Sequence, residues 1–121
     1  MNTDDAAVQY AQATYPDTDI VVSLYGMNVV WTSQAFAEGL GYSVKELTGK
    51  SLRDIMVLTP EQIVAMSAEF IEGKTIKDDT RMLVRRDGDH VEDHADIYAY
   101  MTNGEPFIAV VGSSTAHPYQ K

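Results

Sequence analysis

The 121-residue sequence contains no cysteine. It therefore has no disulfide, no thiolate nucleophile and no cysteine-ligated metal. Basic residues are also few, with nine lysines and arginines against eighteen acidic residues and a formal net charge of −9. Because this charge repels phosphate groups, we expect no direct binding to nucleic acids or to anionic membranes.

Long apolar runs and common catalytic motifs are missing as well. No apolar stretch approaches the roughly 18–20 residues that cross a bilayer, and the polar start MNTDD does not resemble a signal peptide. We therefore expect a cytoplasmic location. The chain has no G-x-S-x-G elbow, glycine-rich phosphate loop or H-E-x-x-H motif, so we expect neither catalytic residues nor an enzymatic activity.

The length and composition are those of one globular domain. Hydrophobic residues make up 45% of the chain and charged residues 22%, which suits a single core. Cap and turn residues predict a helix, two strands, four helical pieces and three strands. These are a helix over Thr3–Thr14, strands over Ile20–Tyr25 and Val29–Thr32, helices over Gln34–Leu40, for one turn after Ser43, over Leu52–Met56 and over Pro60–Glu72, and strands over Thr75–Arg86, Asp89–Met101 and Pro106–Gly112. We predict an α+β fold, a five-stranded antiparallel sheet with the short helices and the longer helix on one face.

The N-terminal helix is rich in alanine and has only a small apolar stripe. Asp4 and Asp5 lie in its first turn, where acidic side chains suit the helix dipole. Two interpretations are open: the helix frays, or it flanks the domain and packs on the sheet or on a partner.

The stretch Trp31–Asp54 carries the most specific pattern. Ser43 and Glu46 have the spacing of a capping box, in which each side chain bonds the backbone of the other residue. Gly49 stops the helix that follows, and Ser51 can cap the next one. Three such short helices are suited to cover one face of a sheet.

These motifs resemble those of PAS domains. The chain reads Ala35-Phe36, Gly41-Tyr42-Ser43, Glu46-Leu47 and Gly49-Lys50-Ser51-Leu52, and later Arg85-Arg86-Asp87-Gly88, in the order and spacing of that family. The resemblance covers Asp19–Ser113 and departs from the family at Ser33, where asparagine is usual. It implies a flanking helix and connection over 1–18, a PAS domain over 19–113, and a tail or truncated linker over 114–121.

The resemblance implies a sensory module that binds a small molecule, dimerises, or does both. Such a module passes its signal to a histidine kinase of a two-component system or to a transcription regulator. Two alternatives are open, a PAS dimerisation module with a filled core and a small α+β isomerase. The LOV branch of the family pairs a cysteine with its flavin, which this chain cannot do.

No cofactor is expected, although non-covalent flavin binding stays open. Haem is disfavoured because the predicted helix Pro60–Glu72 offers iron only Met66 and no histidine. We expect a small-ligand pocket between that helix and the sheet. Its candidate lining residues are Met66, Phe70, Met82, Ile97 and Phe107.

The predicted strand over Asp89–Met101 is unusually rich in charged and histidine side chains. His90 and His94 are about 13 Å apart on a strand, too far to share a metal, so we expect a solvated polar face and no metal site. A weak metal site formed by His94 with Glu92 or Asp96 stays open as an alternative. Asp93 lies on the face of Val91 and Ala95, where it is either an interior carboxylate that marks a polar ligand or, the interpretation we favour, exposed by a bulge or strand end.

Two contacts are also predicted. Glu46 should form an ion pair with Arg85 or Arg86, because those regions approach each other in PAS domains. The second face of the sheet should be apolar, since Ile20–Tyr25 and Pro106–Gly112 are apolar on both faces. The helix Thr3–Thr14 can hide only part of it, so we predict a symmetric homodimer through that helix and the outer sheet face.

Overall fold

The computed structural model describes residues 2–57, 61 and 75–112. Five strands form one antiparallel sheet in the order β2-β1-β5-β4-β3. The strands are β1 (Thr18–Ser23), β2 (Asn28–Thr32), β3 (Thr75–Val84), β4 (His90–Thr102) and β5 (Glu105–Gly112), and the helices are α1 (Thr3–Thr14), α2 (Gln34–Gly39), α3 (Val44–Leu47) and α4 (Leu52–Ile55). The predicted α+β fold is confirmed. The helix expected over Pro60–Glu72 lies outside the described residues apart from Glu61.

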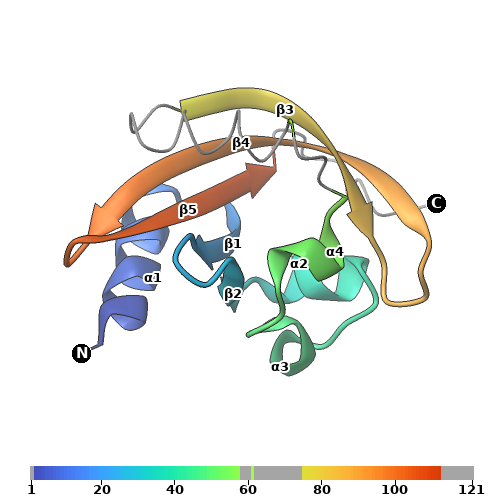
Figure 1. Ribbon diagram of the computed structural model, residues 1–121, viewed down its shortest axis with the longest axis horizontal. Coiled ribbons are helices and arrows are strands. Elements are labelled where there is room, and N and C mark those ends of the chain that lie inside the picture. Colours follow the sequence, from blue (N-terminus) through green and yellow to red (C-terminus); the bar gives the residue numbers. More distant parts are fainter. Residues whose placement is uncertain (1, 58–60, 62–74, 113–121) are drawn as a thin grey trace.

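The helices fall into two groups on either side of β1 and β2. Figure 1 shows α1 apart from α2, α3 and α4, with the first two strands between the groups in this view. Helix α1 contributes two fully buried residues, Ala7 and Ala11, to a cluster with Val21 and Ala109 of the sheet. Of the two interpretations of the N-terminal helix, packing on the sheet of its own chain is therefore the one observed.

Serine caps start the short helices where the sequence predicts them. The Ser33 hydroxyl accepts a bond from the Phe36 amide at 3.2 Å. The predicted capping box is complete: the Glu46 amide donates to Ser43 Oγ at 3.1 Å, and the Ser43 amide donates to Glu46 Oε1 at 3.0 Å. Each bond satisfies an amide that has no partner within its helix.

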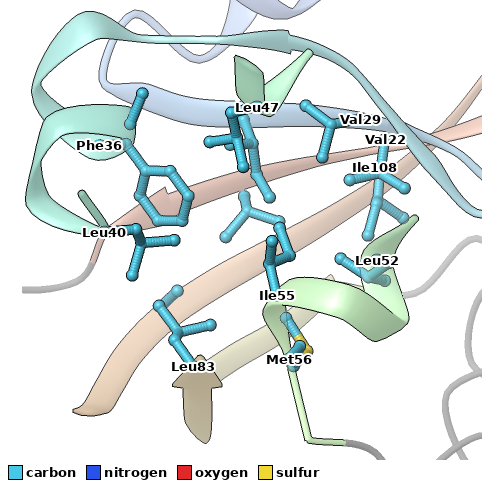
Figure 2. Packing of buried hydrophobic residues seen from close by; sticks show 14 of the residues in the cluster. Val22, Val29, Phe36, Leu40, Leu47, Leu52, Ile55, Met56, Leu83 and Ile108 are labelled. Atoms are coloured by element: carbon cyan, nitrogen blue, oxygen red, sulfur yellow. The ribbon is translucent and has the colours of Figure 1, made fainter. Parts of the chain in front are cut away.

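Two hydrophobic clusters lie on opposite faces of the sheet. The inner cluster joins the sheet to α2, α3 and α4, whose apolar side chains converge on the same space (Figure 2). Its largest fully buried members include Ile20, Leu40, Leu47, Leu52, Ile55, Met56, Leu83, Ile97 and Ile108. The outer cluster holds α1 against the sheet through Ala7, Ala11, Val21, Tyr100, Phe107 and Ala109.

Strand β4 belongs to both clusters because its side chains alternate between the two faces. Ala95 and Ile97 are fully buried in the inner cluster. Tyr100 lies opposite Phe107 of β5, and both belong to the outer cluster. Strand β4 therefore contributes side chains to the packing on both sides of the sheet.

Candidate functional site

A buried ion pair connects β3 and β4 on the inner face of the sheet. Arg81 and Asp93 are directly opposite in the strand register, and Arg81 Nη2 lies 3.2 Å from Asp93 Oδ2. Asp93 has no solvent exposure and Arg81 only 5%. Their strand neighbours Leu83 and Ala95 belong to the inner cluster, so the pair is part of the interior wall of the domain.

This position corrects the favoured interpretation of Asp93 as an exposed residue. Strand β4 begins at His90, and pairing with β3 is regular from Val84↔His90 to Thr80↔His94, so neither a bulge nor a strand end exposes it. Burying a lone carboxylate is costly, and the guanidinium opposite offsets that cost. Counting outward from Asp87-Gly88 as a two-residue turn would have set Arg81 opposite His94; in the structure Arg85 bonds to Asp89 across a longer loop, and this register sets Arg81 opposite Asp93.

Asp19 of β1 is the third charged group in this region. It lies between Thr18, paired with Val111, and Ile20, paired with Val110, where the β1–β5 register shifts. The Gly112 backbone acts on this carboxylate by lowering its pKa, and Gly112 lies opposite Ala95 of β4. Burial and the negative charge of Asp93 raise the pKa of Asp19 to about 6, against the lowering effects of Gly112 and Arg81.

The predicted five-residue pocket is not assembled by the residues that the structure describes. Met66 and Phe70 lie outside them. Ile97 is in the inner cluster as expected, but Phe107 belongs to the outer cluster, on the other face of the sheet. Met82 lies opposite Glu92 and is 38% exposed. Met82 and Phe107 are thus wrong as partners of Ile97, because strand alternation sends them to the other face.

A tyrosine cluster lies on the outer face, where α1 meets β4. The Tyr100 hydroxyl donates to the Ala7 carbonyl at 2.8 Å, and burial, followed by the neighbouring Tyr15 and Tyr10, raises the pKa of Tyr100. Tyr15 stacks on Tyr98 with ring centroids 4.2 Å apart. Tyr10 lies 4.7 Å from Tyr100 between centroids. The cluster ties α1 to the same strand that carries Asp93.

The β3–β4 hairpin also holds the short helices. Arg86 Nη2 lies 3.0 Å from Glu46 Oε2, which confirms the predicted ion pair. The Arg86 amide donates to the Leu40 carbonyl at 2.8 Å, and Arg85 Nη1 donates to the Gly39 carbonyl. The capping bond from Ser43, followed by the charge of Arg86, lowers the pKa of Glu46.

The described part of the chain has neither a metal-ligand cluster nor a membrane-spanning helix. Among residues 2–57, 61 and 75–112, no three histidine, aspartate or glutamate side chains lie close enough to hold one metal ion. His94 Nε2 lies 3.2 Å from Glu92 Oε1 on the outer face. None of the described helices has the length and hydropathy of a membrane span.

Comparison with known families identifies the class of this domain. The family model described as PAS domain matches residues 18–115, so the chain belongs to the PAS family. PAS domains are in general sensory modules. No curated protein matches the chain in a sequence search.

Solved structures agree with this fold at low sequence identity. A Light-Oxygen-Voltage domain studied with a flavin analogue has 18% identity and a TM-score of 0.66, over 94% of this chain and 90% of that one. The PAS domain of an HTR-like protein from Haloarcula marismortui has 19% identity and a TM-score of 0.59, over 88% of each chain. The LOV domain of the blue-light activated histidine kinase EL346 from Erythrobacter litoralis has 15% identity and a TM-score of 0.62, over 83% of this chain and 98% of that one.

Proposed function

We propose that this PAS domain is a sensory module that converts a change on the inner face of its sheet into a change in the docking of α1. The observation that carries the proposal is the double role of β4. Asp93 and Ile97 line the inner face, while Tyr100, three residues further on, bonds to α1 on the outer face. Strand β4 is paired with β3 on one side and β5 on the other, and in this proposal it carries a shift at Asp93 along to Tyr100.

The input in this proposal is a small molecule bound against the inner face, near Ile97 and the Arg81–Asp93 pair. A buried ion pair among apolar side chains gives such a ligand polar groups that fix its orientation. No cofactor is expected, and haem is disfavoured. Flavin is the alternative suggested by the similarity to a LOV domain studied with a flavin analogue. With no cysteine in the chain, flavin would be held without a covalent bond.

The output in this proposal is a symmetric homodimer that acts on a histidine kinase or a transcription regulator. Tyr10 of α1 is 45% exposed, and Val30 and Trp31 of β2 are only partly buried against the outer cluster. Their apolar surface lies beside the outer cluster, where a second copy would cover it. Similarity to the LOV domain of a histidine kinase supports a kinase effector. The cytoplasmic location predicted from the sequence is part of this proposal.

A purely structural dimerisation module is the second candidate. The observation that favours it is the filled inner cluster, where Leu40, Leu47 and Ile55 are fully buried beneath the short helices. Both candidate functions include the homodimer, but the dimerisation module binds no ligand.

Native mass spectrometry and an absorption spectrum of freshly purified protein separate these candidates. The sensory proposal expects a retained small molecule and no visible absorption beyond the protein bands. A Soret band, which haem gives at about 400 nm, would contradict the expected lack of haem. A protein that carries no ligand, and binds none from a metabolite library, would contradict the small-molecule input.

The dimer is tested by light scattering on the full chain and on a chain without residues 1–15. We expect a dimer for the full chain, and weaker association or aggregation after the deletion. If both remain monomers at high micromolar concentration, the dimer is wrong.

A further inference from the structure

An Asn-Gly pair forms the turn between β4 and β5, beside the start of α1. The register partners Thr102 and Glu105 close the two strands. Only Asn103 and Gly104 lie between them, and both have positive φ, 50° and 80° respectively, as a type I′ hairpin turn requires. Both residues are exposed. The turn therefore presents to water an asparagine side-chain amide and the backbone nitrogen that follows it.

The two groups that can react with each other in this turn are both accessible. In a two-residue hairpin the flanking residues make the closing hydrogen bonds, so the ladder does not need the Gly104 amide. A Cβ placed on Gly104 would meet no heavy atom within 4 Å, so this side of its backbone is open. The Asn103 side chain makes a long contact at the surface, with Nδ2 3.4 Å from Thr3 Oγ1, which fixes the amide only weakly.

The other two asparagines of the chain lack this combination. Asn28 is followed by Val29, which is fully buried and whose amide already donates to a backbone carbonyl at 2.9 Å. Asn2 is the cap of α1, and its side-chain oxygen accepts a bond from the Asp5 amide at 2.7 Å. The residues that follow these two asparagines, valine and threonine, are β-branched and crowd the backbone nitrogen. The structure thus distinguishes the turn asparagine from both of the others.

We propose that Asn103 is a site of spontaneous covalent modification, at which the chain converts its own asparagine to aspartate and isoaspartate. The Gly104 nitrogen attacks Cγ of Asn103, the new C–N bond closes a cyclic imide, and Nδ2 leaves as ammonia with the proton of the Gly104 amide. Water then opens the imide at either of its two carbonyls. One opening gives aspartate, and the other gives isoaspartate, in which the main chain runs through Cγ. The sequence of steps consumes one water and releases one ammonia.

The isoaspartyl product changes the hairpin and its contact with α1. Its main chain is one carbon longer, in a turn whose two residues fit the register of β4 and β5. Its carboxylate projects from a different atom, so the contact between Asn103 and Thr3 is lost. We expect the end of the hairpin and the first turn of α1 to loosen, while the Tyr100–Ala7 bond, further from the turn, is kept. This chemistry needs neither a bound small molecule nor a second copy of the chain, so it goes beyond the proposed function.

Ageing of the folded full chain in mildly alkaline buffer tests the proposal. Peptide mass spectrometry measures the loss of the amide at each asparagine, and methylation by an isoaspartyl methyltransferase detects isoaspartate. We expect the loss of one amide per chain, at Asn103, while Asn2 and Asn28 keep theirs. A parallel sample unfolded in urea gives the rate without the fold. The proposal is overturned if Asn103 stays intact in the folded chain while the unfolded sample loses this amide, or if Asn2 or Asn28 reacts first.

Two variants separate the chemistry from its effect on the hairpin. Asn103→Gln keeps an amide on a longer side chain that closes the ring poorly, so it should abolish amide loss and methylation at this position. Asn103→Asp supplies the charge without lengthening the main chain. The Glu105 amide should exchange its hydrogen several-fold faster in the aged wild type than in the fresh one, and Asn103→Asp should resemble the fresh chain. Equal exchange in fresh and aged wild type would contradict the effect on the hairpin. Ageing of the wild type decides the modification itself even if a variant does not fold.

Discussion

Arg81 and Asp93 face each other across β3 and β4, with Nη2 3.2 Å from Oδ2 and neither side chain more than 4% exposed. Each charge is tolerated in the interior because the other is there. The pair places charged groups on the inner face of the sheet, beside a cluster made up of hydrophobic side chains.

The first prediction concerns the loss of one partner of this pair. Asp93→Ala leaves a buried guanidinium without its carboxylate and should lower the free energy of unfolding by about 3–5 kcal/mol. Denaturation with urea measures the loss. Glu92→Ala, which removes an exposed acid from the other face of the same strand, should change stability by less than about 0.5 kcal/mol.

Replacing both partners separates charge from packing. Arg81→Met combined with Asp93→Leu should regain most of the stability lost in Asp93→Ala, because two apolar side chains leave no buried charge without a partner. If Asp93→Ala costs less than about 1 kcal/mol, the Asp93 carboxylate is not what compensates the buried charge of Arg81.

The second prediction concerns the attachment of α1. Tyr100→Phe keeps the ring and removes the hydroxyl that donates to the Ala7 carbonyl. One buried hydrogen bond contributes about 1 kcal/mol to the free energy of unfolding. Tyr100→Phe should therefore lower the melting temperature by the amount that corresponds to this loss. Tyr25→Phe is the control, because Tyr25 is 69% exposed. Equal effects of the two substitutions would show that the Tyr100 hydroxyl does not hold α1.

The third prediction concerns the Glu46–Arg86 pair. Both side chains are largely exposed, so salt should screen the attraction. Glu46→Gln keeps an acceptor for the Ser43 cap and loses only the charge. We expect a small loss of thermal stability at low salt that disappears at about 0.5 M sodium chloride, where screening is nearly complete. A loss that does not depend on salt would assign the effect to the cap.

The pH dependence of that contact has a definite sign. The folded-state pKa of Glu46 is lowered by the Ser43 bond and by Arg86, so its stabilising effect is present above the unfolded-state pKa. It is lost as the pH falls through the folded-state value. The difference between Glu46→Gln and the wild type should accordingly shrink in acid.

The fourth prediction concerns Asp19, whose pKa in the folded state is raised, whereas that of Glu46 is lowered. Its folded-state pKa is raised to about 6 from the ordinary value of 3.8. A raised pKa means that protonated Asp19 favours the folded state. This contribution to the free energy of unfolding is fully present below the unfolded-state pKa and is lost as the pH rises through about 6. Asp19→Asn should therefore be more stable than the wild type at pH 7.5, by at most about 3 kcal/mol, and should match it near pH 4.

Melting temperatures across this pH range measure the effect, with Asp17→Asn as the exposed control. A difference between Asp19→Asn and the wild type that is constant with pH would show that the amide acts through packing. The Asp19 carboxyl group would then not be the source of the pH dependence.

Sequence reasoning succeeded where the determining contacts are local. The capping box of Ser43 and Glu46 depends on residues three positions apart, and the structure has both of its bonds. It failed for Asp93, because strand alternation says which residues share a face without saying which cross-strand neighbour each one meets. The Arg81 guanidinium that makes the burial of Asp93 tolerable lies twelve residues away.

The pocket residues could not be assigned for a different reason. Strand β5 is apolar on both faces, so its composition gives no signal that Ile108 faces the short helices while Phe107 faces α1. The face that Phe107 takes depends on its packing with α1. The small alanines of that helix leave room for the rings of Phe107 and Tyr100 beneath it. Packing between segments so distant in the chain leaves no periodic signal in either of them.

Hydrogen exchange in α1 tests the central claim most directly, which is that β4 couples the inner face of the sheet to the docked helix. The comparison is between the wild type and the chain with Arg81→Met and Asp93→Leu, which alters only the inner face. We predict that the amides of Ala7 and Ala11 exchange several-fold faster or slower in the variant, while those of β2 are unchanged. Unchanged exchange in α1, together with altered exchange at the substituted sites in β3 and β4, would contradict the coupling.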